Sequence, residues 1–313
     1  MDNFNTFILH EEYSRVENLG DTLSNISKSI NWEAFRSIIS QIYKDNSETG
    51  GRPHWDEILM IKVLILQHLY GLSDYDIERY CYDRISFRHF LGYPSSIPDR
   101  STIWLFRERL QEGGVLNEIW GELQLQIDNM GFSIKRGVIQ DASFITSDPG
   151  HAKKDKPRGK EACTRRSKDG TWSKKGNRSY FGFKMHTLVD KENQIIREVG
   201  TTAASVHDSN VDLSDEGQTV YRDRGYFGVK PKASMDKTMK RATRNHPLSD
   251  KDNRRNKAIS RTRSLVERPY AVMKRIFKSG HVLVTTIERV HVKNVFSCFA
   301  YNLYRLKSAK NLP

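Results

Sequence analysis

The sequence has little cysteine and no long apolar run. Its three cysteines, Cys81, Cys163 and Cys298, include no Cys-x-x-Cys pair, so neither a disulfide framework nor a cysteine-based zinc site is indicated. The most apolar stretch, residues 58–72, is interrupted by polar residues and falls short of the roughly 20 apolar residues that span a membrane. The first residues lack the basic start of a secretory signal. These absences predict a protein of a reducing compartment with no membrane partner.

Basic residues are scarce in the first part of the chain and abundant in the rest. Residues 1–130 hold 12 Lys and Arg against 20 Asp and Glu, a net charge of −8, whereas residues 131–313 hold 39 against 18, a net charge of +21. A basic surface of that size suits a polyanion, and nucleic acid is the commonest one. Aromatic residues such as Trp172 and Tyr180 lie among the charges, so this basic half is expected to fold.

Hydrophobic periodicity predicts helices before residue 131. Residues 1–50 are expected to form a lead-in with one short helix over residues 31–43, and residues 51–131 a compact all-helical domain. Within that domain the predicted helices cover residues 56–70, 74–82, 86–91, 102–112 and 115–130. Residues 101–109 could be the reading helix of a helix-turn-helix, although the acidic balance of this part favours packing or dimerisation at least as much.

After residue 135 the apolar spacing becomes that of β-strands. Strands are predicted over residues 137–147, 179–190, 194–205 and 218–228, and the second and third form a hairpin. Later helices, one of them over residues 291–306, complete a mixed α/β sheet with helical cover in residues 132–313. Two polar, basic insertions, residues 148–178 and 230–257, are expected to be loops that flank the site.

Two aspartates interrupt the predicted strands. Asp141 stands where a core strand normally has an apolar residue, and Asp223 does the same in the fourth strand. If these two strands are neighbours, with the hairpin on the far side of the first strand, the carboxylates lie close together and repel each other unless a divalent cation lies between them. Glu267, on a helix predicted over residues 259–278, would supply a third oxygen ligand.

Three carboxylates without His or Cys favour Mg²⁺ or Mn²⁺ over zinc. Two such ions about 4 Å apart can activate an attacking oxygen and stabilise a leaving one in in-line phosphoryl displacement. Arg263 and Lys274 share a helical stripe with Glu267 and are therefore predicted to contact phosphates rather than metal.

The residues themselves leave alternatives open at several positions. Asp208 could replace Asp223, although an aspartate at the start of a turn or helix is usually an N-cap. His186 and His207 could line the site, although a lone histidine in a strand is more often simply hydrogen-bonded. Arg222 and Arg224 flank Asp223 and are expected to point away from its face and to form surface ion pairs.

The motifs, in this order, resemble those of the DDE transposases of bacterial insertion sequences, most closely the IS-five family, which is related to the IS-four family. VIQDASF resembles the first motif, RDRGYFG the second, and RSLVERPYAVMK the third. The helical run up to residue 110 and the segments YFGFKMHTLVD and AASVHDSN are also similar, so the resemblance extends from about residue 52 to residue 306. Ser260 stands where the family usually has a tyrosine, three residues before the arginine of the third motif. Pro269, two residues after Glu267, indicates that this glutamate lies in the first turn of a helix or at a kink.

The resemblance implies an RNase H-like catalytic domain that cuts DNA at transposon ends and uses the freed 3′-hydroxyl to attack target DNA. Asp141, Asp223 and Glu267 would be the catalytic residues and the ligands of two Mg²⁺ or Mn²⁺ ions. The implied partners are double-stranded DNA, as terminal inverted repeats and as target, and further copies of the chain in a homodimer or larger assembly. The implied location is the prokaryotic cytoplasm, at the nucleoid. The residues predicted to bind DNA are Arg263, Lys274, Lys153, Lys154, Arg165, Arg166, Lys174 and Lys175.

Two other functions compete with transposition. A metal-dependent nuclease with the same fold would hydrolyse DNA without strand transfer. A non-catalytic DNA-binding protein would keep its biological activity after Asp141→Ala. A tyrosine recombinase is disfavoured because no His-x-x-Arg occurs in the chain.

Overall fold

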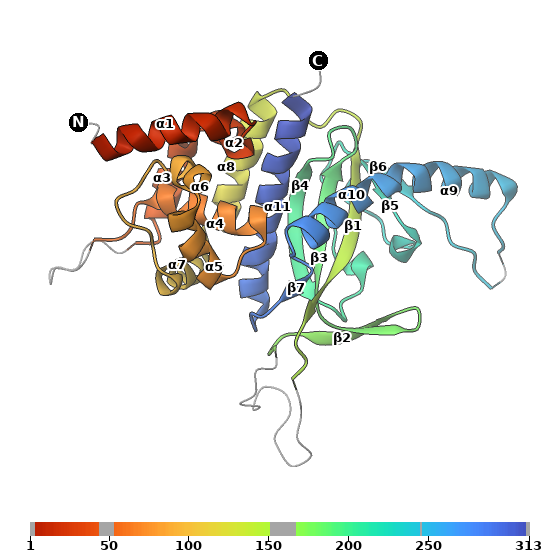
Figure 1. Cartoon of the computed structure of the whole chain (residues 1–313). Coiled ribbons are helices and arrows are strands. Elements are labelled where there is room, and N and C mark those ends of the chain that lie inside the picture. Colours follow the sequence, from red (N-terminus) through yellow and green to blue (C-terminus); the bar gives the residue numbers. More distant parts are fainter. Residues whose placement is uncertain (1–3, 44–52, 151–166, 245, 311–313) are drawn as a thin grey trace, which may run out of the picture. The chain divides into compact units, whose positions relative to one another are not determined.

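The structure is a computed structural model that describes residues 4–43, 53–150, 167–244 and 246–310 (Figure 1). The chain divides into a helical unit, Met1–Gly131 with Asn302–Pro313, and an α/β unit, Phe132–Tyr301. Within the described ranges, no helix combines the length and the apolarity needed to cross a bilayer.

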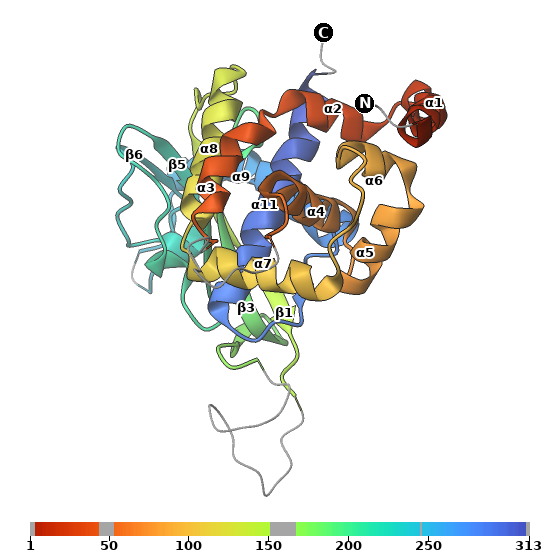
Figure 2. The same ribbon diagram turned by 90° about the vertical axis from the view of Figure 1, so that its left-hand side faces the viewer.

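The helical unit is built of short helices around one buried helix, α4. Its elements are α1 (Phe4–Asn18), α2 (Thr22–Ser29), a 3₁₀ turn (Trp32–Phe35), α3 (Arg36–Ser40), α4 (Glu57–Tyr70), α5 (Asp74–Asp83), α6 (Ile85–Phe90), α7 (Arg100–Glu112) and α8 (Leu116–Asn129). Figure 2 shows α4 surrounded by α3, α5, α6 and α7. Asp56 caps its start by accepting from Leu59 N at 2.8 Å, and Gly71 ends it in the left-handed conformation with φ 58°. The predicted helix over residues 56–70 is therefore confirmed.

The first 43 residues contain more structure than the sequence predicted. Two helices, α1 and α2, precede the predicted one, and residues 31–43 hold only a 3₁₀ turn and the short α3. Asp21 caps α2 by accepting from Leu23 N at 2.9 Å, and its other oxygen accepts from the Tyr13 hydroxyl at 2.7 Å. Tyr13, Leu23 and Ile26 are buried. The expectation of a lead-in with one helix was wrong because tertiary packing of a few apolar side chains stabilises helices whose sequence is mostly polar.

The α/β unit is a mixed sheet with its first strand in the interior. Its strands are β1 (Val138–Ser147), β2 (Thr171–Lys175), β3 (Arg178–Asp190), β4 (Ile196–Ala203), β5 (Thr219–Arg222), β6 (Met235–Thr238) and β7 (His281–Val282). The order is β2-β3-β1-β5-β6, while β4 pairs with β3 and β7 pairs with β1. β1 is antiparallel to β3 and parallel to β5. The predicted arrangement, with the first strand between the hairpin and the fourth strand, is confirmed.

Helices cover the face of the sheet that carries the odd-numbered residues of β1 and β3. They are α10 (Glu267–Ala271), which continues into a π-helical turn (Val272–Ile276), and α11 (Ile287–Lys310). The Tyr270 hydroxyl lies 2.8 Å from Thr187 Oγ1, and Cys298 Sγ lies 3.8 Å from the sulfur atoms of both Met185 and Met273. A helical region followed by a mixed sheet with flanking helices is the α/β, RNase H-like class that the sequence predicted.

Parts of the second predicted basic loop are regular structure. Residues 230–257 contain β6 and the first part of α9 (Asp250–Arg263). Ser249 and Asp252 form a capping box at the start of α9. The amide of the buried Asn256 accepts from Lys240 N and donates to Lys240 O, both at 2.9 Å. The loop expectation was wrong because the cap and this tertiary contact stabilise a helix whose other side chains are mostly charged.

The continuous helix predicted over residues 259–278 is interrupted. α9 ends at Arg263, a 3₁₀ turn (Ser264–Val266) follows, and α10 begins at Glu267. Pro269 therefore lies in the first turn of α10, where the missing N–H of proline removes no helical hydrogen bond. The break explains how a proline two residues after Glu267 is accommodated.

Candidate active site

Asp141 lies in β1 on the face that is covered by α10. Its Oδ1 accepts from Ala142 N at 2.9 Å, and its Oδ2 accepts from Arg263 Nη2 at 3.0 Å. The Tyr270 hydroxyl donates to the main-chain oxygen of Asp141 at 2.8 Å. Burial raises the pKa of Asp141; the Arg263 guanidinium opposes this increase, and Asp223 adds to it. Asp141 is thus a carboxylate in a largely buried position with the guanidinium of Arg263 beside it.

Asp223 lies in the turn that follows β5, next to Asp141. Val138 and Ile139 of β1 pair with Val220 and Tyr221 of β5, and extending this register by two residues brings Asp141 level with Asp223. The sequence placed Asp223 inside a strand, whereas β5 ends one residue earlier. The carboxylate of Asp223 caps a 3₁₀ turn instead, so the convergence of the two acids is produced at the end of the strand.

The geometry of this turn explains the glycine in the Asp-x-Gly-Tyr pattern. Asp223 Oδ1 accepts from Gly225 N at 2.7 Å. A Cβ atom on residue 225 would lie 2.9 Å from that same oxygen, closer than real Cβ contacts come. The side chain of Tyr226 is fully buried, and its pKa is raised by burial and by the nearby carboxylates of Asp208, Asp141 and Asp223. Three aspartates therefore lie close enough to one buried tyrosine to raise its pKa.

Asp208, the rival of Asp223, is paired with a lysine. Asp208 begins a 3₁₀ turn (Asp208–Asn210), and its Oδ1 lies 2.7 Å from the Nζ atom of Lys184, which also donates to Val206 O at 2.7 Å. The side chain of Lys184 is 9% exposed. The negative charge of Asp208 is therefore largely balanced within the protein, and this favours Asp223 as the partner of Asp141.

Glu267 starts α10 between two residues that contact Asp141. Arg263 lies one turn before it and Tyr270 one turn after it, so Glu267 belongs to the stripe that faces β1. Its side chain is exposed. The structure thus places Glu267 at the edge of the site, and its role as third ligand stays a prediction.

The residues predicted to bind DNA have different environments. Arg263 is paired with Asp141, and Lys174 and Lys175 are exposed on β2, within the segment that the sequence predicted as the first basic loop. The pKa of Lys274 is lowered by burial and by Lys175, so these two lysines are neighbours. The remaining four, Lys153, Lys154, Arg165 and Arg166, lie outside the described residues. The DNA-binding assignments stay predictions.

The donor atoms near Asp141 fit a hard divalent cation. Asp141 and Asp223 offer only oxygen, as Mg²⁺ and Mn²⁺ prefer. In the part of the chain that the structure describes, however, no three His, Cys, Asp or Glu side chains are grouped so as to hold a metal ion. Arg263 contacts Oδ2 of Asp141 and the side chain of Glu267 is exposed, so metal binding by the predicted triad stays a prediction.

Several residues around the site were not singled out as site residues by sequence reasoning. Lys184 neutralises Asp208, Tyr270 fastens α10 to β1, and Arg222, predicted to form surface ion pairs, is fully buried. Tyr270 carries a weak sequence signal, since it lies seven residues after Arg263 and hence on the same helical stripe. Lys184 and Arg222 carry none, because their burial depends on segments distant in sequence.

Replacing His186 should reduce the loss of stability in acid. Its Nε2 lies 2.8 Å from Thr202 Oγ1, and burial lowers its pKa from 6.5 to about 4, with the positive charge of Lys184 also lowering it and Asp208 opposing. Below pH 6.5 the unfolded chain binds a proton that the folded chain rejects, so stability is lost as the pH falls toward 4. The loss from this group is about 3 kcal/mol. Urea unfolding of His186→Gln across this range should show a flatter pH dependence, and an unchanged dependence would contradict the assignment.

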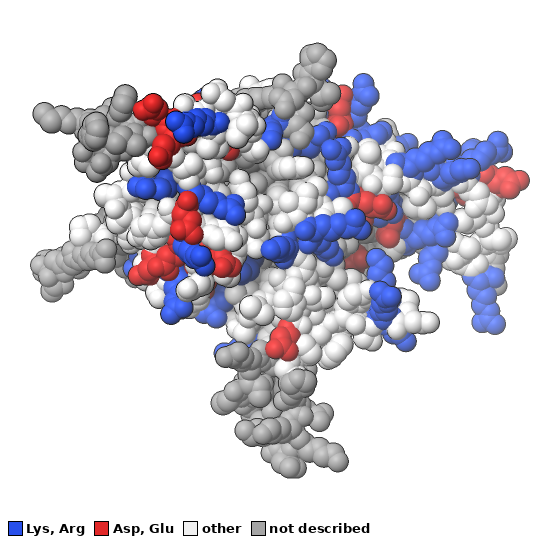
Figure 3. Space-filling model, viewed as in Figure 1, with Lys and Arg blue, Asp and Glu red and all other residues white. Residues whose placement is uncertain are grey.

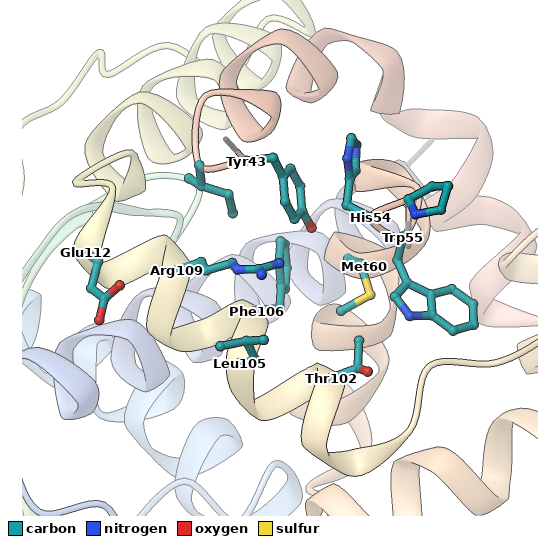
Figure 4. A pocket seen from close by; sticks show the side chains of 11 residues that line it. Tyr43, His54, Trp55, Met60, Thr102, Leu105, Phe106, Arg109 and Glu112 are labelled. Carbon is teal, nitrogen blue, oxygen red and sulfur yellow. The ribbon is translucent and has the colours of Figure 1, made fainter. Parts of the chain in front are cut away.

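The helical unit contains a separate pocket of about 520 Å³ that none of the predicted catalytic residues lines (Figure 4). The ring of Tyr43 stacks on that of His54 at 4.1 Å, and the guanidinium of Arg109 lies 5.3 Å from the Tyr43 ring. Trp55 and Phe106 also line it. Because Arg109 of α7 is turned to this pocket, the last residue of the predicted reading helix contributes to packing within the unit.

Comparison with known families agrees with the geometry. The family model of the transposase DDE domain matches residues 133–303, more than half of the chain, and that of a transposase domain (DUF772) matches residues 10–109. No solved structure matches the chain. DDE transposases are polynucleotidyl transferases that act on DNA and generally use divalent metal ions. With both matches in this order on one chain, the protein belongs to the DDE transposases of the IS-four/IS-five superfamily type.

Proposed function

We propose that this transposase belongs to the IS-five family, cuts DNA at the ends of its insertion sequence and joins the freed 3′-hydroxyl to target DNA with two Mg²⁺ or Mn²⁺ ions. The observation that carries the proposal is the convergence of Asp141 and Asp223 where β1 pairs with β5, next to the helix that bears Glu267. The chemistry is two successive in-line displacements at phosphorus. In the first, water attacks and the 3′-oxygen leaves; in the second, that 3′-hydroxyl attacks a target phosphate and the target strand's 3′-oxygen leaves.

We assign the roles within the site as follows. Asp141, Asp223 and Glu267 hold the divalent ions, which when bound activate the attacking oxygen and stabilise the leaving one. Arg263 shifts from Asp141 to a phosphate oxygen, and Lys274, with Lys175 beside it, contacts the backbone further along. The half-buried position of Lys274 strengthens its attraction to a phosphate, because less water screens it.

The remaining parts of the proposal concern organisation. Residues 51–131 would serve dimerisation or binding of the element's ends, and residues 132–313 would be the catalytic domain. Double-stranded DNA, as terminal inverted repeats and target, and at least one further copy of the chain would be the partners. The protein would act at the nucleoid in the prokaryotic cytoplasm.

The proposal is tested with purified protein, Mg²⁺, DNA ends that carry the element's inverted repeats, and a target plasmid. Joined products are expected for the natural chain, and a loss of at least about 10²-fold in both cutting and joining is expected for Glu267→Gln, because the amide is a poor metal ligand. Hydrolysis of the ends without joining would indicate a nuclease. Full activity of Asp141→Ala would indicate a non-catalytic DNA-binding protein.

A further inference from the structure

A shallow groove of about 500 Å³ follows one side of α9 in the α/β unit. Its lining includes three cations, Arg224, Lys257 and Arg261, together with the short polar side chains of Asn253, Ser260 and Ser264. No lining residue is acidic. The three cations are exposed, and within the described residues none of them forms an ion pair with a carboxylate. The groove is therefore a basic surface whose charge no carboxylate among the described residues neutralises. Figure 3 shows Lys and Arg side chains gathered over α9.

The groove is held in place by contacts on the inner side of α9. Asn256 is buried and exchanges two hydrogen bonds with the main chain of Lys240, and Arg255 Nη1 donates to Thr238 O at 2.8 Å. The Ser249 cap fixes the start of the helix. Lys257 and Arg261 lie one turn apart along the groove. Because α9 is fastened to the end of β6 in this way, a ligand would meet cations whose backbone positions are already set.

The groove adjoins the acidic site through two sequence neighbours. Arg224 directly follows Asp223, so its backbone belongs to the turn that Asp223 caps. Arg261 and Ser264 flank Arg263, whose guanidinium contacts Asp141. One side of the groove thus begins next to Asp223, and the other begins next to Arg263, which contacts Asp141. If one phosphate of a DNA strand lies at Asp141 and Asp223, the next phosphates of that strand would lie along α9.

We propose that this groove binds the phosphodiester backbone of the DNA strand next to the phosphate that reacts at Asp141 and Asp223. The assignment rests on the proposed function for the position of the reacting phosphate. Arginine and lysine neutralise phosphates, and serine and asparagine side chains are common donors to phosphate oxygens. Such contacts set the register of the strand in the site and carry no base specificity. Ser260 takes part as one of these short donors, in place of the bulky tyrosine usual in the family.

The test is the salt dependence of DNA binding by the full chain, measured by fluorescence anisotropy without divalent metal on a duplex that carries the element's end. The logarithm of the DNA association constant falls linearly with the logarithm of the salt concentration. Each lost phosphate contact makes this slope shallower by about 0.9. The double variant Lys257→Ala/Arg261→Ala should therefore have a slope that is shallower by about 2, and its binding should be weakened equally on unrelated DNA sequences. Lys257→Arg, which keeps the charge, should keep the slope. Lys251→Ala is the matched control, since Lys251 is an exposed lysine of the same helix that does not line the groove.

Two outcomes would overturn the proposal: equal slopes for the double variant and the natural chain, or an equal loss for Lys251→Ala. Photocrosslinking provides an independent measurement, because Ser260→Cys with an aryl azide should form an adduct with the DNA and Lys251→Cys should not. These assays do not depend on catalysis. A chain that binds through the groove but does not join strands would refute the proposed function alone, and normal cutting and joining with an unchanged slope in the double variant would refute the groove alone.

Discussion

Asp223→Asn is expected to abolish DNA cutting and joining, by at least about 10³-fold, whereas Asp208→Asn is expected to reduce them less than about 10-fold. The reason is the different state of the two carboxylates. Asp223 lies level with Asp141 across the β1–β5 pairing, while the charge of Asp208 is balanced by Lys184 at 2.7 Å. The measurement is the rate of end cleavage with Mg²⁺, on variants whose DNA binding without metal is unchanged.

The two variants should also differ in their free energy of unfolding. Asp208→Asn leaves the ammonium of Lys184, which is only 9% exposed, without its carboxylate, so a loss of about 2 kcal/mol in the free energy of unfolding is expected. Asp223→Asn keeps an oxygen to accept from Gly225 N and should change stability by less than about 1 kcal/mol. Inactivity of Asp208→Asn with retained activity of Asp223→Asn would reverse the assignment of the second acid.

Arg222→Ala is expected to destabilise the protein by about 3 kcal/mol, and Arg224→Ala, two residues later, by less than about 0.5 kcal/mol. Arg222 is fully buried, its Nε donates to Thr238 Oγ1 at 2.9 Å, and its Nη2 donates to Val229 O at 2.7 Å. Alanine would leave both acceptors without these bonds and a cavity beside Tyr226, whose ring lies 5.4 Å from the guanidinium. Arg224 is exposed.

This prediction is checked by urea unfolding of both variants. It also bears on function, because Arg222 joins β5 to β6 and to the turn that begins at Asp223. Loss of the arginine should loosen that turn and lower the cutting rate even where the variant remains folded. Equal stability of the two variants would show that the buried guanidinium contributes no more than a surface charge.

The basic segment before Arg263 shows where sequence reasoning about the fold reached its limit. The apolar run and its caps were sufficient to predict α4, because those signals act within a few residues. Residues 250–257 of α9 include no apolar side chain, so their pattern indicated a loop. The contacts that stabilise α9, from Asn256 to Lys240 and from Arg255 to Thr238, join residues 16 and 17 positions apart in the sequence, and such distant contacts leave no mark in the local hydrophobic pattern.

The candidate site, like the fold, was predicted only in part by the sequence. The residue types and order of the motifs determined the family, the RNase H-like class and the candidates Asp141, Asp223 and Glu267, since carboxylates in apolar strands and a charged helical stripe are visible in the sequence alone. Only the tertiary structure decided that Asp223 caps a turn level with Asp141, that Arg263 is paired with Asp141, and that Lys184 neutralises Asp208. Strand register and burial bring these groups together across distant segments, and no local pattern encodes such distances.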